Sequence, residues 1–367
     1  MERRKFLKSA GFGLAAATAA SPALAQGAPE IKWRMASNLP KSLDTAYGTA
    51  EVIAKRVAAA TGGRFQIQVF AAGEIVPGAG VLDAVKDNTV QLGHGPAYYW
   101  VGKDPTFSFD TGLPFGLNAR QHVGWVYEGG GLPLLREFFK DYNVYNIPCG
   151  NTGVQMGGWY RNEIKSVEDL KGLKFRIGGI AGMVLAKLGV VPQQISPGDI
   201  YPALEKGTID AAEFIGPYDD EKLGFNRVAK YYYYPAWWEG GAQQSVFVNL
   251  DEWAKLPKEY QAILEDACAY AQHDMLAKYD LKNPQALKRL IGAGVQLRPF
   301  PNDVLAASYK ACMELYDEMA AKNPRFKKVL ESYMKYRDDV VSWYSVAEAR
   351  YDGFLASVVR SEQKAKK

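Results

Sequence analysis

Residues 163–214 read EIKSVEDLKGLKFRIGGIAGMVLAKLGVVPQQISPGDIYPALEKGTIDAAEF. Three short apolar runs alternate in this segment with two amphipathic stretches, the second of which has Pro in its first turn. Strands are expected over 168–177, 190–196 and 209–214, and helices over 181–188 and from residue 197. The alternation predicts a β-α-β-α-β unit, which implies a buried parallel sheet.

Polar side chains stand at the ends of two of these strands. Arg176 closes the first strand, and Glu213 closes the third. Ligands of open α/β sheets bind at the carboxyl ends of the strands, so both side chains are candidates for a binding site.

The chain before this segment shows a similar pattern. Strands are expected over 30–36, 64–71 and 90–95, with helices over 45–61 and 78–88. Farther on, a strand is expected over 245–249 and helices over 256–279 and 303–323. The fold class is therefore predicted as α/β with two lobes, and 367 residues are enough for both.

The first 25 residues have the order of an export signal. A basic head, RRKFLK at 3–8, precedes an apolar run over 10–20 that is too short to span a bilayer, and Ala-Leu-Ala follows at 23–25. The paired arginines indicate the twin-arginine route, although Glu2 stands where Ser or Thr is usual and leaves the general secretory route open. A signal peptide over 1–25 and a periplasmic mature chain are expected.

Composition excludes several classes of protein. With 48% hydrophobic and 23% charged residues, the chain has the make-up of a globular protein. Without the leader, 40 Lys and Arg face 39 Asp and Glu, which argues against a nucleic-acid partner. Three cysteines do not make a disulfide framework, and the sequence leaves open whether two of them pair or all remain buried thiols.

Three motifs in the central segment resemble one known family. They read DLKGLKFR at 169–176, LGVVP at 188–192 and YPALEKGTIDAAE at 201–213. In order and spacing they are similar to the central segment of DctP-type substrate-binding proteins of TRAP transporters. The resemblance implies a periplasmic protein with the two-lobed binding-protein fold, which closes on a small carboxylate and delivers it to the membrane permease subunits. It also implies that Arg176 pairs with the ligand carboxylate.

The sequence departs from the common family pattern after Glu213. No Asn-Pro follows; instead the chain resembles the branch that binds 2-oxo acids of the pyruvate type together with a metal ion. The resemblance implies a metal site made by Gln155, Glu213, the carbonyl of Phe214, and Glu239, and sodium is expected rather than calcium. Phe214 stands where similar sequences often have Trp.

Physical chemistry supports a cation at this place. Two carboxylates about 4 Å apart repel by about 4 kcal/mol at an effective dielectric of about 20, so a cation or a proton must lie between them. Hard cations prefer oxygen ligands, which Glu213, Glu239 and Gln155 can supply. An exposed turn before Gly240 and Gly241 is the alternative for Glu239.

Three further residues are expected to contact the ligand. Tyr98 and Tyr99 directly follow a strand, and Asn151 is expected on one side of a crossing strand together with Gln155. The alternatives are aromatic packing beneath a loop for the tyrosines and backbone hydrogen bonding for the amides.

Two other functions are left open by the residues themselves. An exported hydrolase or lyase could use Glu213 and Glu239 as acid and base, and a periplasmic carboxylate sensor could use the same pocket. The three histidines form no His-x-x-x-His pair, and no Gly-x-Ser-x-Gly motif is present. A binding protein without enzymatic activity is therefore preferred.

The last segment is expected to be one helix with an apolar face over roughly eight turns. It could fold back over its own chain, but the 2-oxo-acid branch implies a helix exchanged between two subunits of a homodimer. The predicted organisation is a signal peptide at 1–25, lobe I at 26–150 and 240–282, lobe II at 151–239 and 283–324, and a dimerisation helix at 325–367.

Overall fold

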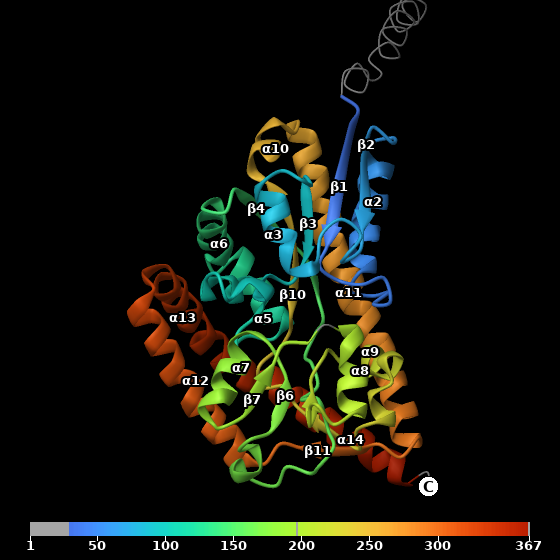
Figure 1. Cartoon of the computed structure of the whole chain (residues 1–367), viewed down its shortest axis with the longest axis vertical. Coiled ribbons are helices and arrows are strands. Elements are labelled where there is room, and N and C mark those ends of the chain that lie inside the picture. The colour runs from blue at the N-terminus through green and yellow to red at the C-terminus, as the bar shows by residue number, and fades with distance from the viewer. Residues whose placement is uncertain (1–28, 196, 366–367) are drawn as a thin grey trace, which may run out of the picture.

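The computed structural model describes residues 29–195 and 197–365, so the predicted signal peptide lies outside the described residues. The chain forms two β-sheets with helices around each, and the long helix α11 (Lys258–Gly292) runs from the upper sheet to the lower one (Figure 1). This is the two-lobed α/β architecture that the sequence predicts. Within the described ranges, no helix is both long and apolar enough to cross a membrane.

We call the five-stranded sheet and its helices lobe I. Its strand order is β2-β1-β3-β10-β4, in which β1 pairs in parallel with β2 and β3, and β10 runs antiparallel to both of its neighbours. The strands are β1 (Ile31–Ser37), β2 (Phe65–Phe70), β3 (Leu92–Gly95), β4 (Val144–Asn151) and β10 (Gln243–Asn249). The helices are α2 (Gly48–Ala60), α3 (Val81–Lys86), α4 (Ser108–Thr111), α5 (Ala119–Tyr127), α6 (Gly131–Lys140) and α10 (Leu250–Lys255).

We call the six-stranded sheet and its helices lobe II. Its order is β11-β9-β5-β8-β6-β7, and the parallel pairing of β6 with β7 and β8 confirms the parallel unit predicted from residues 163–214. The strands are β5 (Trp159–Tyr160), β6 (Lys174–Arg176), β7 (Val191–Gln193), β8 (Ala211–Ala212), β9 (Tyr231–Tyr234) and β11 (Gln296–Pro299). The helices are α7 (Gly179–Lys187), α8 (Pro197–Glu205), α9 (Pro217–Leu223) and α12 (Asn302–Lys322).

The strand expected over 168–177 is shorter than predicted. Residues Val167–Leu170 form a 3₁₀ turn, and β6 begins only at Lys174. The reason is local: the side chains of Ser166 and Asp169 form a capping box that fixes this turn. The third strand, expected over 209–214, is also shorter than predicted, because β8 covers only Ala211–Ala212.

The crossing strand also ends earlier than expected. β4 stops at Asn151, and residues 152–158 are irregular before β5. Strand alternation therefore does not reach Gln155, and the argument that placed it beside Asn151 on one side of a strand was wrong. The helix expected over 256–279 is longer than predicted, because α11 continues through Pro284.

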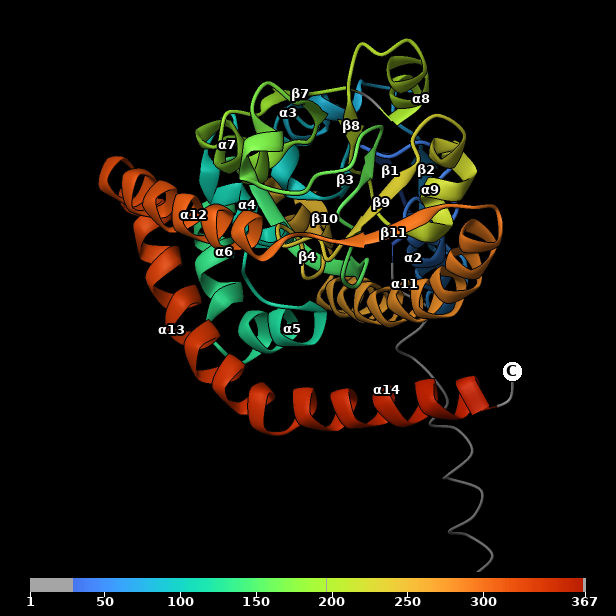
Figure 2. The same ribbon diagram turned by 90° about the horizontal axis from the view of Figure 1, so that it is seen from below.

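The C-terminal segment is two helices instead of one. α13 (Pro324–Val346) ends before Ala347, which forms a turn, and α14 (Glu348–Ala365) begins directly afterwards. The first turns of α13 pack on their own chain, since Phe326 and Tyr333 are fully buried. α14 has no buried residue and runs past α5 and α11 (Figure 2). The fold-back alternative therefore holds for the first part of α13 and fails for α14.

Candidate binding site

Arg176 and Glu213 meet because β6 and β8 are parallel neighbours. The register pairs Arg176 with Ala212, which places Glu213 just beyond the carboxyl ends of both strands. Nη1 of Arg176 donates to Oε1 of Glu213 at 2.6 Å and to the Glu213 carbonyl at 2.7 Å. Nε donates to the carbonyl of Ile195 at 3.2 Å. Both charged side chains are buried.

One nitrogen of this guanidinium remains available. Among the described residues, Nη2 of Arg176 has no hydrogen-bond partner, and Arg176 lies in the wall of the cleft described below. The planar fork of Arg thus holds Glu213 with one terminal nitrogen and presents the other to the cleft, an arrangement suited to a carboxylate.

Glu213 and Glu239 form a second electrostatic pair. Burial raises the pKa of Glu213 to about 7, although the guanidinium of Arg176 acts to lower it. Burial, and next the charge of Glu213, raise the pKa of Glu239 well above its ordinary value. Two carboxylates and one guanidinium therefore share a poorly solvated space, which favours uptake of a cation or a proton.

Gln155 joins this cluster through its backbone. Its N–H donates to the Glu239 carbonyl at 3.2 Å, and its carbonyl accepts from the N–H of Ala236 at 3.2 Å. The N–H of Met156 in turn donates to the carbonyl of Ile215 at 3.1 Å. Three segments distant in sequence are thereby held side by side.

The side chain of Gln155 leaves an oxygen without a donor. Its amide Nε2 lies 3.3 Å from Oγ1 of Thr152, to which it donates, while Oε1 is buried and has no partner in the part of the chain that the structure describes. A buried carbonyl oxygen without a donor is costly in free energy unless a ligand or water occupies the space in front of it. With two carboxylates nearby, this oxygen fits the donor set of a hard cation.

The backbone at Phe214 is fixed by close packing. Gly158 has φ of +86°, and a Cβ there would lie 2.7 Å from the carbonyl oxygen of Ala212 and 3.0 Å from Cα of Glu213. The ring of Phe214 is 5.5 Å from the guanidinium carbon of Arg176. Within the described residues, no group of three or more His, Cys, Asp or Glu side chains forms a metal centre, so a cation here would need the amide and carbonyl oxygens as well.

A cleft of about 540 Å³ opens in front of the ion pair. Lobe I contributes Tyr98 and Tyr99, whose ring centres are 4.7 Å apart, and lobe II contributes Arg176 and Glu213. Burial, and then the nearby Tyr99 and both glutamates, raise the pKa of the Tyr98 hydroxyl, which places the ring close to the charged cluster. These four predicted residues are therefore brought together in one cleft.

The remaining predicted residues lie outside the cleft wall. Gln155, Phe214 and Glu239 do not line it: Gln155 and Glu239 are joined by the backbone hydrogen bond described above, and Phe214 follows Glu213 in the chain. Asn151 is buried, and its Oδ1 accepts from the N–H of Gly153 at 2.9 Å, as the structural alternative expected. Its Nδ2 has no partner in the described structure, so the amide retains a donor.

Several further residues that line the cleft were not predicted from the sequence. Asn38, Pro40 and Gly78 of lobe I and Gln194 and Gly198 of lobe II also line the cleft. Asn38 directly follows β1, and Gln194 directly follows β7. The strand-end rule that selected Arg176 would have selected both.

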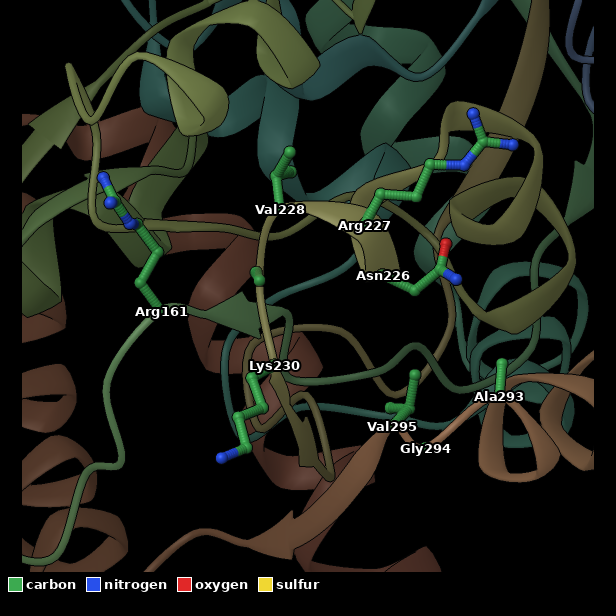
Figure 3. Close-up of a pocket in the computed structure, with 9 residues that line it drawn as sticks. Arg161, Asn226, Arg227, Val228, Lys230, Ala293, Gly294 and Val295 are labelled. Carbon is green, nitrogen blue, oxygen red and sulfur yellow. The ribbon is translucent and has the colours of Figure 1, made fainter.

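A second hollow, of about 290 Å³, lies on the surface of lobe II (Figure 3). It contains Arg161, Arg227 and Lys230, all exposed, and none of the predicted site residues. The two hollows share no lining residue, and of the two only the first has the buried Arg176 and Glu213 in its wall.

The fold and this cleft are those of an extracytoplasmic solute-binding protein, and comparison with known proteins gives the family. Residues 35–323 match the model of the bacterial extracellular solute-binding protein family 7, DctP, and the chain belongs to that family. The enzymatic hypothesis is thereby set aside, because the family and its neighbours serve transport.

Three relatives are similar over nearly their whole length. A monocarboxylate 2-oxoacid-binding periplasmic protein of Nostoc sp. is 48% identical over 97% of this chain and 100% of its own. The second is a TRAP transporter solute-binding protein of Bordetella bronchiseptica, a mixed-occupancy dimer with copurified calcium and picolinate. It is 55% identical, the match covers 91% of this chain and 99% of its own, and the TM-score is 0.89. The third is a TRAP periplasmic solute-binding protein of Pseudoalteromonas atlantica with bound sodium and pyruvate. It is 40% identical, the match covers 88% of this chain and 98% of its own, and the TM-score is 0.85.

Proposed function

We propose that this protein binds a small 2-oxo monocarboxylate together with a cation and delivers it to the membrane subunits of a TRAP transporter. The observation that carries the proposal is the buried guanidinium of Arg176, which holds Glu213 and still presents Nη2 to the cleft. The 2-oxoacid-binding relative from Nostoc and the relative from Pseudoalteromonas with bound pyruvate support a 2-oxo acid as the ligand.

The ligand carboxylate would accept hydrogen bonds from Arg176. Tyr98 and Tyr99 would cover the ligand from lobe I. Asn151 does not line the cleft, but its Nδ2 has no partner among the described residues and would be a further donor. A 2-oxo acid offers a carboxylate oxygen and a neighbouring keto oxygen, which together can chelate one cation.

The cation would be held by Oε1 of Gln155, the carboxylates of Glu213 and Glu239, and the carbonyl of Phe214. A cation there would offset part of the negative charge of the two carboxylates and of the ligand. Sodium is the first candidate: a sodium ion and one proton retained on Glu239 supply the same charge as a calcium ion, and burial already favours that proton. The relatives carry either ion.

The test is binding of pyruvate to the mature protein in sodium, in calcium, and in choline chloride with a chelator. We expect pyruvate to raise the melting temperature only when one of the cations is present, since a ligand that binds the folded state stabilises it. Proton NMR of the same sample should show pyruvate unchanged, as required of a binding protein. Binding of equal strength without a cation would overturn the proposed site, and consumption of pyruvate would restore the enzymatic hypothesis.

We infer further that a second copy of the chain covers α14. Large apolar side chains are exposed along α14 and the end of α13: Val341, Trp343, Val346, Tyr351, Phe354, Leu355 and Val359. Exposed apolar residues gathered in one segment are typical of a surface that another protein covers. The Bordetella relative, described as a dimer, supports a homodimer. Light scattering on the mature chain tests this, and a monomer at micromolar concentration would rule it out.

A further inference from the structure

The carboxylate of Asp44 accepts hydrogen bonds from two ammonium groups and one hydroxyl group. Asp44 lies in the loop between β1 and α2, and the donors are Lys222, the hydroxyl of Tyr218 at 2.9 Å, and Lys282 at 3.2 Å. Both ammonium groups also lie over the ring of Tyr218, at 4.1 and 4.4 Å from its centre. We call these four residues the Asp44 clasp.

The clasp joins the two lobes. Asp44 belongs to lobe I, Tyr218 and Lys222 lie on α9 of lobe II, and Lys282 lies on α11, which packs against both. Although burial acts to raise the pKa of Asp44, hydrogen bonds from Lys222, Tyr218 and Lys282 lower it to about 2. The carboxylate is therefore ionised at any physiological pH, and the clasp stays charged.

Helix α9 offers a rigid base for these contacts. Oδ2 of Asp220 accepts from the indole N–H of Trp159 at 2.9 Å and from the Tyr232 hydroxyl at 2.7 Å. Asp219 accepts from the hydroxyl of Tyr279 on α11 at 2.7 Å. α9 begins at Pro217, only three residues after Phe214, which belongs to the proposed cation site. A shift of α9 would therefore also move that part of the site.

The loop that carries Asp44 is itself part of the cleft. Asn38 and Pro40, at its start, line the cleft wall. Leu39 and Leu43 are buried in one apolar cluster with Phe214 of lobe II. A movement that separates Asp44 from α9 would therefore also withdraw one wall of the cleft from the ligand.

We infer that Asp44 is a positioning residue for ligand binding, which holds the two lobes together and slows release of the ligand. The inference rests on the proposed function, because lobe closure matters only if the cleft binds a ligand. It concerns residues that do not touch the ligand, and it assigns a task to charges that the binding site leaves unused.

The expected change in ligand affinity depends on how far the charged side chains are exposed to solvent. The side chains of Asp44 and Lys222 are 48% and 37% exposed, so a single pair here would contribute little, whereas a network of several donors contributes more. We expect Asp44→Asn, which keeps the shape and removes the charge, to raise the dissociation rate and the Kd by about three- to tenfold. Because the charges are partly exposed, high salt should reduce the difference from the parent.

The matched control is Asp83→Asn. Asp83 pairs with Lys103 at 3.0 Å, with comparable exposure of both side chains, but this pair lies entirely within lobe I. A general loss of surface charge would affect both variants alike. Closure of the lobes predicts an effect in Asp44→Asn alone.

The deciding measurement is the distance between spin labels on the two lobes. Lys55→Cys on α2 and Lys206→Cys beyond α8 provide exposed attachment sites, and the three native cysteines are buried. In ligand-free protein, we expect Asp44→Asn to lengthen the distance distribution relative to the parent and to Asp83→Asn. With pyruvate and sodium, stopped-flow tryptophan fluorescence should show faster release from the same variant.

Two results would overturn the inference. One is an unchanged distance distribution with unchanged release, and the other is an equal change in the Asp83→Asn control. If the parent fails to bind pyruvate, the proposed function fails, but the ligand-free distances still test the clasp. A double-mutant cycle of Asp44→Asn with Lys222→Met must in addition show non-additive effects, since the two charges act as one unit.

Discussion

Replacing Arg176 with Lys tests the site at the group that connects the ligand to the protein. In the structure, Nη1 of Arg176 donates to the side chain and the carbonyl of Glu213, while Nη2 has no partner among the described residues and Arg176 lines the cleft. The three N–H donors of Lys share one nitrogen, so they cannot reproduce the planar fork that spreads donors toward Glu213 and toward a ligand carboxylate. The substitution keeps the positive charge and removes the fork.

The expected loss is one charge-assisted hydrogen bond to the ligand. Such bonds contribute about 1.5–3 kcal/mol each. Since about 1.4 kcal/mol corresponds to a tenfold change in affinity, Arg176→Lys should raise the Kd for pyruvate roughly ten- to hundredfold. Loss of Nε as a donor to the Ile195 carbonyl adds a smaller cost to folding.

Isothermal titration calorimetry with pyruvate and sodium measures the Kd, and urea unfolding measures stability in parallel. Arg161→Lys, on the exposed surface of lobe II, is the matched control and should bind as the parent does. If folded Arg176→Lys protein retains the parent Kd and loses only stability, Arg176 is a structural ion-pair residue and the ligand assignment is wrong.

Four other outcomes are expected. The pKa of Glu213 is about 7 in the folded protein, against an ordinary 4.5, so its contribution to stability is complete below about pH 4.5 and is lost as the pH rises through 7. Burial also raises the pKa of Asp110 and Asp219 to about 7 and that of Asp220 to about 6, so urea unfolding in chelated, sodium-free buffer should show a decline in stability that Glu213→Gln reduces by up to roughly 3 kcal/mol. Gln155→Met removes the unpartnered Oε1 at similar volume, and titration with sodium should show a weaker cation requirement or no binding, whereas unchanged cation dependence would remove Gln155 from the site. A chain ending after Val346 keeps the buried turns of α13 and should be monomeric by light scattering; a persistent dimer would place the interface elsewhere. Gly158→Ala forces a Cβ to within 2.7 Å of the Ala212 carbonyl oxygen at positive φ, so thermal unfolding should show a loss of about 2–4 kcal/mol, and a loss below 1 kcal/mol would mean that the backbone relaxes without strain.

The sequence by itself determined the elements whose signals are local. The alternation of apolar runs and helices in 163–214 predicts parallel strands, and the structure pairs β6 with β7 and β8 in parallel. From that pairing alone, Arg176 and Glu213 must lie next to each other, because neighbouring parallel strands end at the same edge of the sheet. The family motifs lie in this same segment, and for this reason class and fold could both be predicted.

Only the tertiary structure decided what joins distant segments. Gln155 reaches Glu239 through a backbone hydrogen bond between an irregular stretch and a turn, and neither has a periodicity from which its direction could be predicted. The meeting of Asp44 with Lys222 depends on how two lobes pack. The break at Ala347 divides a segment whose apolar period is continuous, since periodicity records which face is apolar and not whether the axis stays straight. Local patterns come from bonds between near neighbours in the chain, whereas these contacts arise only when the complete surfaces of both lobes have formed.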